Sequence, residues 1–152
     1  MTKLTNQNIL VKRVLLTIIL NCFFLLFFAQ LSFDHLSVTN GLSQSTVLSI
    51  CKDSRGYLWF GTRDCLNRYD GRRVKIYRTN PDDPSSISSE DYIYALLSDK
   101  KQNLWIGTQS GLNRYIPEQD AFERIPFDPK NPNSISDKII LSMLADRNEI
   151  RF

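Results

Sequence analysis

Residues 53–62 read DSRGYLWFGT and residues 99–108 read DKKQNLWIGT, so the same segment returns after 46 residues. The similarity continues with CLNRY at residues 65–69 and GLNRY at residues 111–115. Upstream, the apolar runs 47–51 and 93–97 have a third counterpart at 140–144, and an aspartate follows each run after one residue. Repetition with a period in the forties is typical of stacked β units that cannot bury their own faces.

Each repeat is predicted to contain four short strands. In the first copy these strands cover residues 47–51, 58–62, 66–69 and 74–77. Gly56 and Gly71 lie in turns between them, where glycine adopts a positive φ at low cost. The second strand is apolar at consecutive positions, which indicates burial on both of its faces. Trp59 and Trp105 are therefore expected to fill the space between stacked units.

These observations predict an all-β fold of β-propeller repeats: about two four-stranded blades plus the first strand of a third, in an incomplete propeller. Proline, aspartate, asparagine and serine favour turns and end strand pairing in the segments between repeats. We expect a lead-in at 30–43, a first blade at 44–79, a linker at 80–92, a second blade at 93–127, and a linker with the truncated start of a third blade at 128–152. The repeated positions expected to maintain this structure are Asp53, Gly56, Trp59, Gly61, Thr62, Asp99, Trp105, Gly107, Thr108 and Gly111.

Residues 1–29 differ in composition from the rest of the chain. Lys3, Lys12 and Arg13 precede the apolar run 14–28, an order that is typical of a secretory signal peptide. The run is short for a membrane span, which needs about 20 apolar residues. We expect cleavage near Ala29 and a periplasmic mature protein; an uncleaved leader would instead anchor the protein in the membrane. Cys22 fits a lipoprotein signal poorly, because the apolar run continues beyond it.

The charge of the chain argues against nucleic-acid binding. There are 19 Lys and Arg against 16 Asp and Glu, and three of the basic residues lie in the leader, so residues 30–152 carry no net charge. A nucleic-acid surface needs a basic excess. One local basic cluster is interpreted as a solvated strand edge, where charge blocks unwanted pairing. It consists of Arg68, Arg72, Arg73, Lys75 and Arg78.

Patterns for catalysis, cofactors or metals are not recognisable in the sequence. His35 is the single histidine and is expected to be an ordinary surface or packing residue. The glycines belong to turns and strand ends rather than to a phosphate-binding loop, and no loop has the ligand spacing of a calcium site. We predict no catalytic, cofactor-binding or metal-binding residues, and the sequence does not identify ligand-binding residues.

The cysteines outside the leader give little information beyond compartment. Cys51 and Cys65 match no metal motif and no disulfide framework, and whether an exported protein joins them stays open. Cys65 stands where the second repeat has Gly111. If that position requires a positive φ, the cysteine costs about 1 kcal/mol or more.

The order of these motifs resembles the two-component regulator propeller repeat. The resemblance rests on FDHL at residues 33–36 and NGLS at residues 40–43, followed by the LWFGT strand and LNRYDG at residues 66–71. It covers residues 33–152 and implies the start of the extracytoplasmic sensor of a hybrid two-component system, as found in Bacteroides-like bacteria. In that family two seven-bladed propellers precede a β-sandwich, a membrane helix, a histidine kinase, a receiver and often a DNA-binding domain.

The resemblance implies a sensor that detects polysaccharide-derived sugars and signals to transcription. With two complete repeats and no kinase, this chain is expected to be a non-catalytic N-terminal fragment, with oligosaccharide as a partner through the complete propeller. Its other expected partners are the rest of a sensor protein, or a second copy bound through exposed blade faces. Two alternatives stay open: a structural or protein-interaction propeller segment, and a fragment of an enzyme propeller, whose turns fit the spacing of Asp, Gly and Trp less well.

Overall fold

The computed structural model describes residues 11–21, 34–132, 134–146 and 150–151. The chain divides into a unit of residues 1–35 and a unit of residues 36–152. In the first unit, residues 11–21 form an α-helix with exposed side chains. No helix within the described ranges is long and apolar enough to cross a membrane. Cys22 and the expected cleavage site at Ala29 lie outside the described residues.

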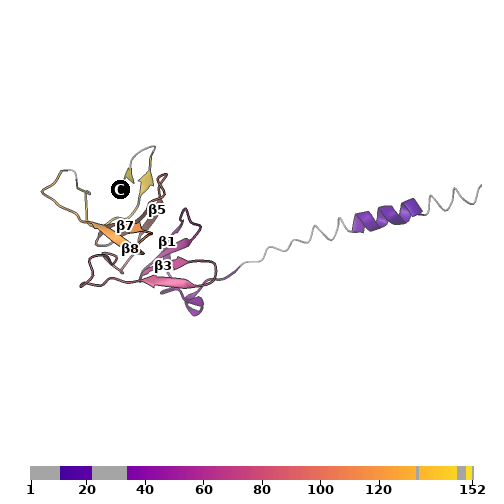
Figure 1. Ribbon diagram of the computed structural model, residues 1–152, viewed down its shortest axis with the longest axis horizontal. Helices are drawn as coiled ribbons and strands as arrows, with labels where there is room; N and C mark the ends of the chain where they lie inside the picture. The colour runs from indigo at the N-terminus through magenta and orange to yellow at the C-terminus, as the bar shows by residue number, and fades with distance from the viewer. Residues whose placement is uncertain (1–10, 22–33, 133, 147–149, 152) are drawn as a thin grey trace, which may run out of the picture. The chain divides into compact units, whose positions relative to one another are not determined.

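The second unit contains two four-stranded antiparallel sheets, called blade 1 and blade 2 from here on. Both are meanders in which strands adjacent in sequence pair with each other, and Figure 1 shows β1 and β3 beside β5, β7 and β8. The predicted all-β fold with four strands per repeat is confirmed. Blade 1 consists of β1 (Val47–Lys52), β2 (Leu58–Thr62), β3 (Leu66–Tyr69) and β4 (Val74–Tyr77). Blade 2 consists of β5 (Ala95–Ser98), β6 (Leu104–Thr108), β7 (Gly111–Ile116) and β8 (Ala121–Ile125), and a short 3-10 helix, η1 (Val38–Asn40), precedes blade 1.

Two strand predictions differ from the structure. β5 begins two residues later than expected, and the third repeat has β9 (Leu144–Ala145) paired with β10 (Ile150–Arg151) instead of a strand over 140–144. The reason is that the backbone amides of Ile93 and Ile140 form hydrogen bonds with the preceding repeat rather than within their own sheet. Their N–H groups donate to the carbonyl oxygens of Thr62 and Thr108, at 3.0 and 3.1 Å. These isoleucines therefore cross from one repeat to the next before the first strand begins.

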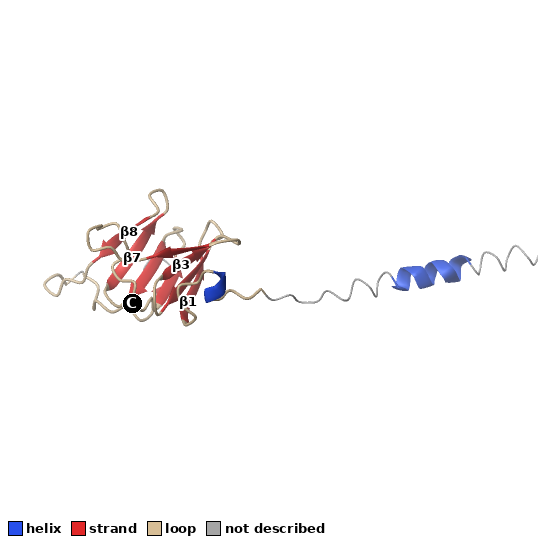
Figure 2. Ribbon diagram, turned by 90° about the horizontal axis from the view of Figure 1, so that it is seen from below, coloured by secondary structure: helices blue, strands red, loops and turns tan. Residues whose placement is uncertain are grey.

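A hydrophobic core lies between the two blades. Trp59 is fully buried, with its ring centroid 5.4 Å from that of Tyr77 and 4.7 Å from that of Tyr115 in blade 2. Figure 2 shows the two sheets as adjacent layers. Burial of one large apolar side chain contributes about 1.5–3 kcal/mol, so contact between the blades supplies much of the stability of this unit. The other buried members of the core are Leu66, Ile87, Ile93, Leu104, Ile106 and Phe122.

Trp105 occupies the equivalent position on the far side of blade 2. Its side chain is half-buried and packs with Ile125 against a smaller cluster formed by Leu112, Ile135 and Ile140. The last two residues belong to the linker and the start of the third repeat. Each tryptophan therefore packs toward the repeat that follows it in sequence.

Gly61 and Gly107 let the next repeat approach closely. A Cβ atom placed on Gly61 would lie 2.6 Å from the carbonyl oxygen of Ile93. On Gly107 it would lie 2.9 Å from the carbonyl oxygen of Ile140. Because backbone occupies this space, a larger residue would push the repeats apart. The glycine before each threonine is thus explained by contact between repeats.

One aspartate organises the first turn of each blade. Asp53 accepts hydrogen bonds from two backbone amides of its turn and from Trp59 Nε1, each at 2.9 Å. Asp99 accepts the equivalent bond from Trp105 Nε1, also at 2.9 Å. The six-residue separation of aspartate and tryptophan thus gives a buried indole N–H its hydrogen-bond partner.

A serine, a threonine and an asparagine connect each linker to the blade that follows. The Ser43 amide donates to Asn67 Oδ1 at 2.9 Å, and Asn67 Nδ2 donates to Ser43 Oγ at 2.8 Å. The Ser43 hydroxyl also lies 3.1 Å from that of Thr62, which is fully buried. The second copy of this triad consists of Ser88, Thr108 and Asn113. Ser43 lies in the segment expected to be a lead-in, and it bonds to blade 1. Ser88 of the 80–92 linker bonds to blade 2 in the same way.

Cys65 adopts φ +79° where Gly111 adopts φ +138°. The condition under which a cysteine at this position is strained is therefore met. Cys65 is buried and Cys51 is half-buried, and both are free thiols. Burial, together with the adjacent Asp64 carboxylate, raises the pKa of the Cys65 thiol to about 12. At neutral pH this thiol is protonated and therefore a poor nucleophile.

Candidate functional site

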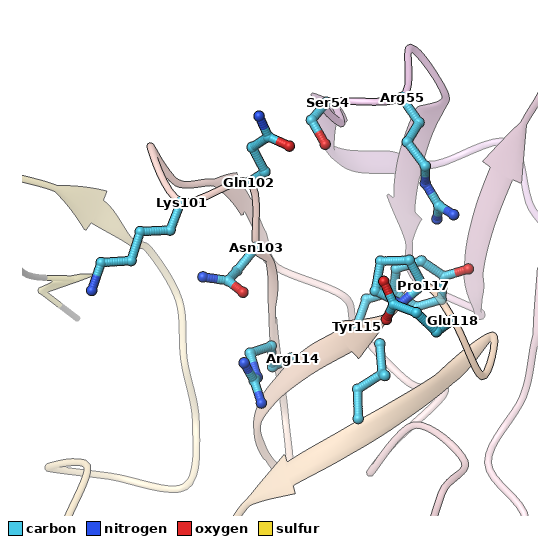
Figure 3. Close-up of a pocket in the computed structure, with 10 residues that line it drawn as sticks. Ser54, Arg55, Lys101, Gln102, Asn103, Arg114, Tyr115, Pro117 and Glu118 are labelled. Atoms are coloured by element: carbon cyan, nitrogen blue, oxygen red, sulfur yellow. The ribbon is translucent and has the colours of Figure 1, made fainter.

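A cavity of about 530 Å³, called the seam cavity below, lies between the two blades at the end that carries the β1–β2 and β5–β6 turns. Its walls come from these two turns, from the end of β7 and from the loop that follows it. Figure 3 shows Ser54 and Arg55 on the turn of blade 1, and Gln102 and Asn103 on the turn of blade 2, where the side chain of Lys101 extends away from Arg55. Concave sites with a few convergent polar groups are typical ligand sites.

Arg55 is the cation that blade 1 contributes to the seam cavity. Its guanidinium carbon lies 5.4 Å from the ring centre of Tyr57 and 5.6 Å from that of Tyr115. These cation–π contacts hold the side chain over both blades. Among the described residues no carboxylate lies within ion-pair distance of Arg55, so its hydrogen-bond donors face solvent and the cavity.

The wall from blade 2 contains two side chains that already have partners, Arg114 and Asn103, and one in an unusual backbone conformation, Gln102. Arg114 forms an ion pair with Glu123 at 2.7 Å, and Asn103 Nδ2 donates to the Asp99 carboxylate at 2.9 Å. Gln102 adopts φ +68° at the position where blade 1 has Gly56 at φ +90°. A glutamine in this left-handed conformation is strained, and such strain is found preferentially at functional sites. Its exposed side chain lines the cavity.

A polar network lies beneath Arg55 and connects the two blades. Asp120, from the β7–β8 loop, forms a 3.0 Å ion pair with Arg68 of β3 and a second ion pair with Lys75 of β4. The hydroxyls of Tyr77 and Tyr115 both donate to the same carboxylate, while Arg68 Nη1 donates to the Tyr115 hydroxyl at 2.6 Å. The carboxylate therefore receives donors from both blades.

The network shifts the acidity of its members. Burial opposes ionisation of Asp120, but the hydrogen bonds from Lys75, Tyr115 and Tyr77 outweigh it, and the pKa of this carboxyl lies below its usual range. Burial and the hydrogen bond to Asp120 raise the pKa of the Tyr77 phenol above its usual value. At neutral pH the network thus contains an ionised Asp120 and a protonated Tyr77.

The interpretation of the basic cluster as a solvated edge is wrong for Arg68, whereas Lys75 is exposed on the edge strand β4, as expected. The Arg68 side chain is only 19% exposed and lies 4.9 Å from the ring centre of Tyr57. Both residues pair with Asp120 because the β7–β8 loop is long enough to reach back to blade 1. Arg72 and Arg73 are exposed, as expected. The fifth member, Arg78, is exposed and lies 3.6 Å from the carboxylates of Asp64 and Glu90.

A second depression of about 320 Å³ lies on the blade 1 side of Tyr57. Its lining includes Arg68, Arg73, Lys75 and Asp70. This depression and the seam cavity open at the same end of the blades, because the β1–β2 and β3–β4 turns lie at one end of a meander. The shared end is therefore rich in basic side chains.

None of the repeated residues identified from the sequence lines the seam cavity, and Gly61, Thr62, Gly107, Thr108 and Gly111 lie at the opposite ends of their strands. They form the turns and contacts between repeats, whereas the cavity uses Arg55 and Gln102, positions at which the two repeats differ. The sequence could have indicated this site, because the two repeats differ at these positions, which follow the aspartate that both repeats share. His35 is exposed, and the described residues contain no group of three or more His, Cys, Asp or Glu placed to hold a metal ion.

Residues 41–64 and 87–110 match the family of the two component regulator propeller. These segments begin at the linker triads and end after β2 and β6. In addition, 56 residues are 54% identical to "Histidine kinase P4" from Formosa agariphila, which corresponds to 37% of this chain and 4% of that protein.

Two solved structures have a similar fold. The extracellular domain of a hybrid two-component system from B. thetaiotaomicron is 31% identical, with a TM-score of 0.68 over 75% of this chain and 16% of that one. A second extracellular domain from the same organism is 24% identical, with a TM-score of 0.57 over 78% of this chain and 15% of that one, and shows the fold alone. The chain thus spans a small part of each of these relatives.

Proposed function

We propose that this chain, which carries repeats of the two-component regulator propeller family, belongs to the extracytoplasmic sensor region of a hybrid two-component signalling protein. The observation that carries the proposal is that both blades agree with one family in sequence and with extracellular domains of such systems in fold. The basic and apolar leader supports export. Signalling to transcription then depends on a histidine kinase in a longer protein.

In this proposal the ligand is an oligosaccharide derived from a polysaccharide, and the chain binds it without catalysis. The seam cavity supports a binding role because its lining combines donors from Arg55, Gln102 and Ser54 with the partly exposed ring of Pro117. Hydroxyl-rich ligands need such donors, and rings provide flat apolar contacts for sugar C–H groups.

Binding of the full chain to a panel of oligosaccharides, measured by isothermal titration calorimetry, tests this function. We expect at least one polysaccharide-derived oligosaccharide to bind and to remain chemically unchanged after incubation. The control protein is Arg63→Ala, which removes an exposed arginine at the opposite end of blade 1 and should bind as the parent does. Absence of binding across the panel, or turnover of a bound sugar, would contradict the proposal.

A second candidate function is protein interaction, and an exposed apolar row on blade 1 favours it. The row consists of Ile50, Phe60 and Ile76. They lie on one face because Ile50 pairs with Phe60, and both Phe60 and Ile76 pair with Asn67, a fully buried polar residue. Ile50 is 63% exposed and Ile76 is 38% exposed. The equivalent row of blade 2 begins with Leu96 and Ile106, which pack against blade 1. Light scattering distinguishes this candidate: it predicts association of the chain that Ile50→Lys weakens.

A further inference from the structure

We propose that the seam cavity recognises an anionic group of the ligand, a carboxylate or a sulfate ester, through Arg55 and Gln102. This inference rests on the proposed function, because it specifies the chemical class of the oligosaccharide. Three independent features of the structure support the inference. They are the cations of the cavity, the strained Gln102, and the hydrogen-bond donors that compensate the nearby acids.

The cations of the cavity outnumber its available acids. Arg55, Lys101 and Arg114 line it, and Glu118 is the one acidic residue among the lining side chains. Arg114 is neutralised by Glu123. Arg55 and Lys101 therefore remain against Glu118, which leaves the lining a net positive charge. Arg55 also offers the planar donor pair that matches carboxylate and sulfate oxygens.

The acids nearest to the two turns do not oppose a bound anion strongly. Asp53 and Asp99 each accept the indole N–H of a tryptophan and backbone amides of their own turn. Hydrogen bonds from the side chains of Trp105 and Asn103 hold the pKa of Asp99 below its usual range, although burial opposes this. Their negative charge is thus compensated by fixed donors on the protein side.

Arg55 is positioned before a ligand arrives. Its guanidinium lies over Tyr115, whose ring is buried and whose hydroxyl donates to Asp120. Asp120 is in turn held by Arg68. A side chain ordered in this way loses less conformational entropy on binding, which raises affinity.

Gln102 supplies a second donor at a conformational cost that the fold itself does not require. The equivalent residue of blade 1 is Gly56, so the turn can be formed by glycine. A glutamine with φ +68° is strained, because its Cβ makes this left-handed backbone conformation unfavourable. Its side chain lines the cavity, lies near Ser54 in Figure 3 and can donate to an anion, which accounts for a glutamine at a glycine position.

The test compares three disaccharides of one size with the full chain, by isothermal titration calorimetry at low salt. One carries a uronate carboxylate, one carries a sulfate ester, and one is uncharged. We expect a charged disaccharide to bind at least about tenfold more tightly than the uncharged one, with affinity that falls as sodium chloride is added. Preference for the uronate or for the sulfate identifies which anion the cavity takes.

Arg55→Ala should weaken binding of the preferred charged disaccharide about tenfold and leave the uncharged one unchanged. Arg55→Lys should restore part of the affinity. Arg63→Ala is the matched control, because Arg63 also lies over a tyrosine, 5.1 Å from the ring of Tyr92, but at the other end of the blade. It should bind as the parent does.

Gln102→Gly separates binding from folding. It replaces a strained residue by the one that blade 1 uses, so its thermal midpoint should equal or exceed that of the parent. Binding of the charged disaccharide should nevertheless weaken about threefold, the loss of one hydrogen bond.

Three results would overturn the inference: equal affinity for charged and uncharged disaccharides, no binding of either charged one, or charged binding that Arg55→Ala and Gln102→Gly leave intact. Tight binding of the uncharged disaccharide alone would leave the proposed sensor function standing. Binding of the charged probes that depends on Arg55, with no response to any polysaccharide-derived sugar of the panel, would support the anion site and contradict the sensor function.

Discussion

Trp59 and Trp105 occupy the same position in two repeats, and each donates its indole N–H to the aspartate six residues before it. Trp59 is nevertheless fully buried, whereas Trp105 is half-buried. The difference arises from what each side chain faces: Trp59 meets the complete sheet of blade 2, and Trp105 meets residues 135–143. The repeat therefore determines local geometry, and the next repeat determines burial and stability.

The largest expected effect is the difference between two alanine substitutions. Trp59→Ala should destabilise residues 36–152 by about 3–5 kcal/mol, because it leaves a cavity in the core between blades. Trp105→Ala should cost about half as much, since part of that side chain is already in contact with water. Urea unfolding followed by circular dichroism measures both. Equal costs would break the comparison between the two tryptophans.

The glycines beside these tryptophans extend the comparison. Gly61→Ala should destabilise the protein by about 1–3 kcal/mol, because its methyl group would overlap Ile93 and the Ser49 hydroxyl. In Gly107→Ala the methyl group would overlap only Ile140, so the loss of stability should be smaller. Thermal unfolding of both variants, with the exposed Ser110→Ala as control, checks the order. A larger loss at Gly107 would show that the third repeat constrains the fold more tightly than blade 2 does.

Asp120 provides a smaller effect that depends on pH. Its pKa is lowered in the folded state, so its ionisation stabilises the protein above the unfolded value of about 3.9, and this contribution is lost as pH falls toward the folded pKa. Asp120→Asn should therefore cost about 1–2 kcal/mol at neutral pH, and the difference from the parent should shrink below pH 4. Urea unfolding at several pH values measures it.

The control for Asp120 is Asp82→Asn, because Asp82 is an exposed linker residue. It should change stability little at any of these pH values. A cost for Asp120→Asn that stays constant from pH 7 to pH 3 would contradict an ionised carboxylate between Arg68 and Lys75.

The smallest expected effect comes from transferring a residue of one repeat to the other. Cys65→Gly introduces the residue that blade 2 has at this position and removes the strain of a positive φ, about 1 kcal/mol. The buried thiol that it deletes makes a contribution of similar size, so the net change should lie within about 1 kcal/mol. Differential scanning calorimetry measures the balance. A loss above about 2 kcal/mol would mean that packing of the thiol dominates at this position.

The features predicted from sequence are those that depend on short-range patterns. The strands of blade 1 follow from apolar runs and from the turns at Gly56 and Gly71, and these strands agree with the structure. The repeat also aligned Cys65 with Gly111, and both residues adopt a positive φ. Such features recur in both repeats, so the pattern in one repeat supports the assignment made in the other.

The features that the sequence did not predict depend on contacts between repeats. Arg68 meets Asp120 across 52 residues, and only the docking of the two blades brings them together. The seam cavity likewise exists because two turns from different repeats face each other. The later start of β5 has the same origin, because the amide of Ile93 bonds to blade 1. Stacking of the sheets, rather than local propensity, decides all three.

Quenching of tryptophan fluorescence in single-tryptophan variants tests most directly the claim that the next repeat determines burial. Trp105→Phe leaves Trp59 as the reporter, and Trp59→Phe leaves Trp105. We expect the Trp59 reporter to emit at shorter wavelength and to be quenched several-fold less by acrylamide than the Trp105 reporter. Equal emission and equal quenching in two folded variants would contradict the packing of blade 2 on blade 1.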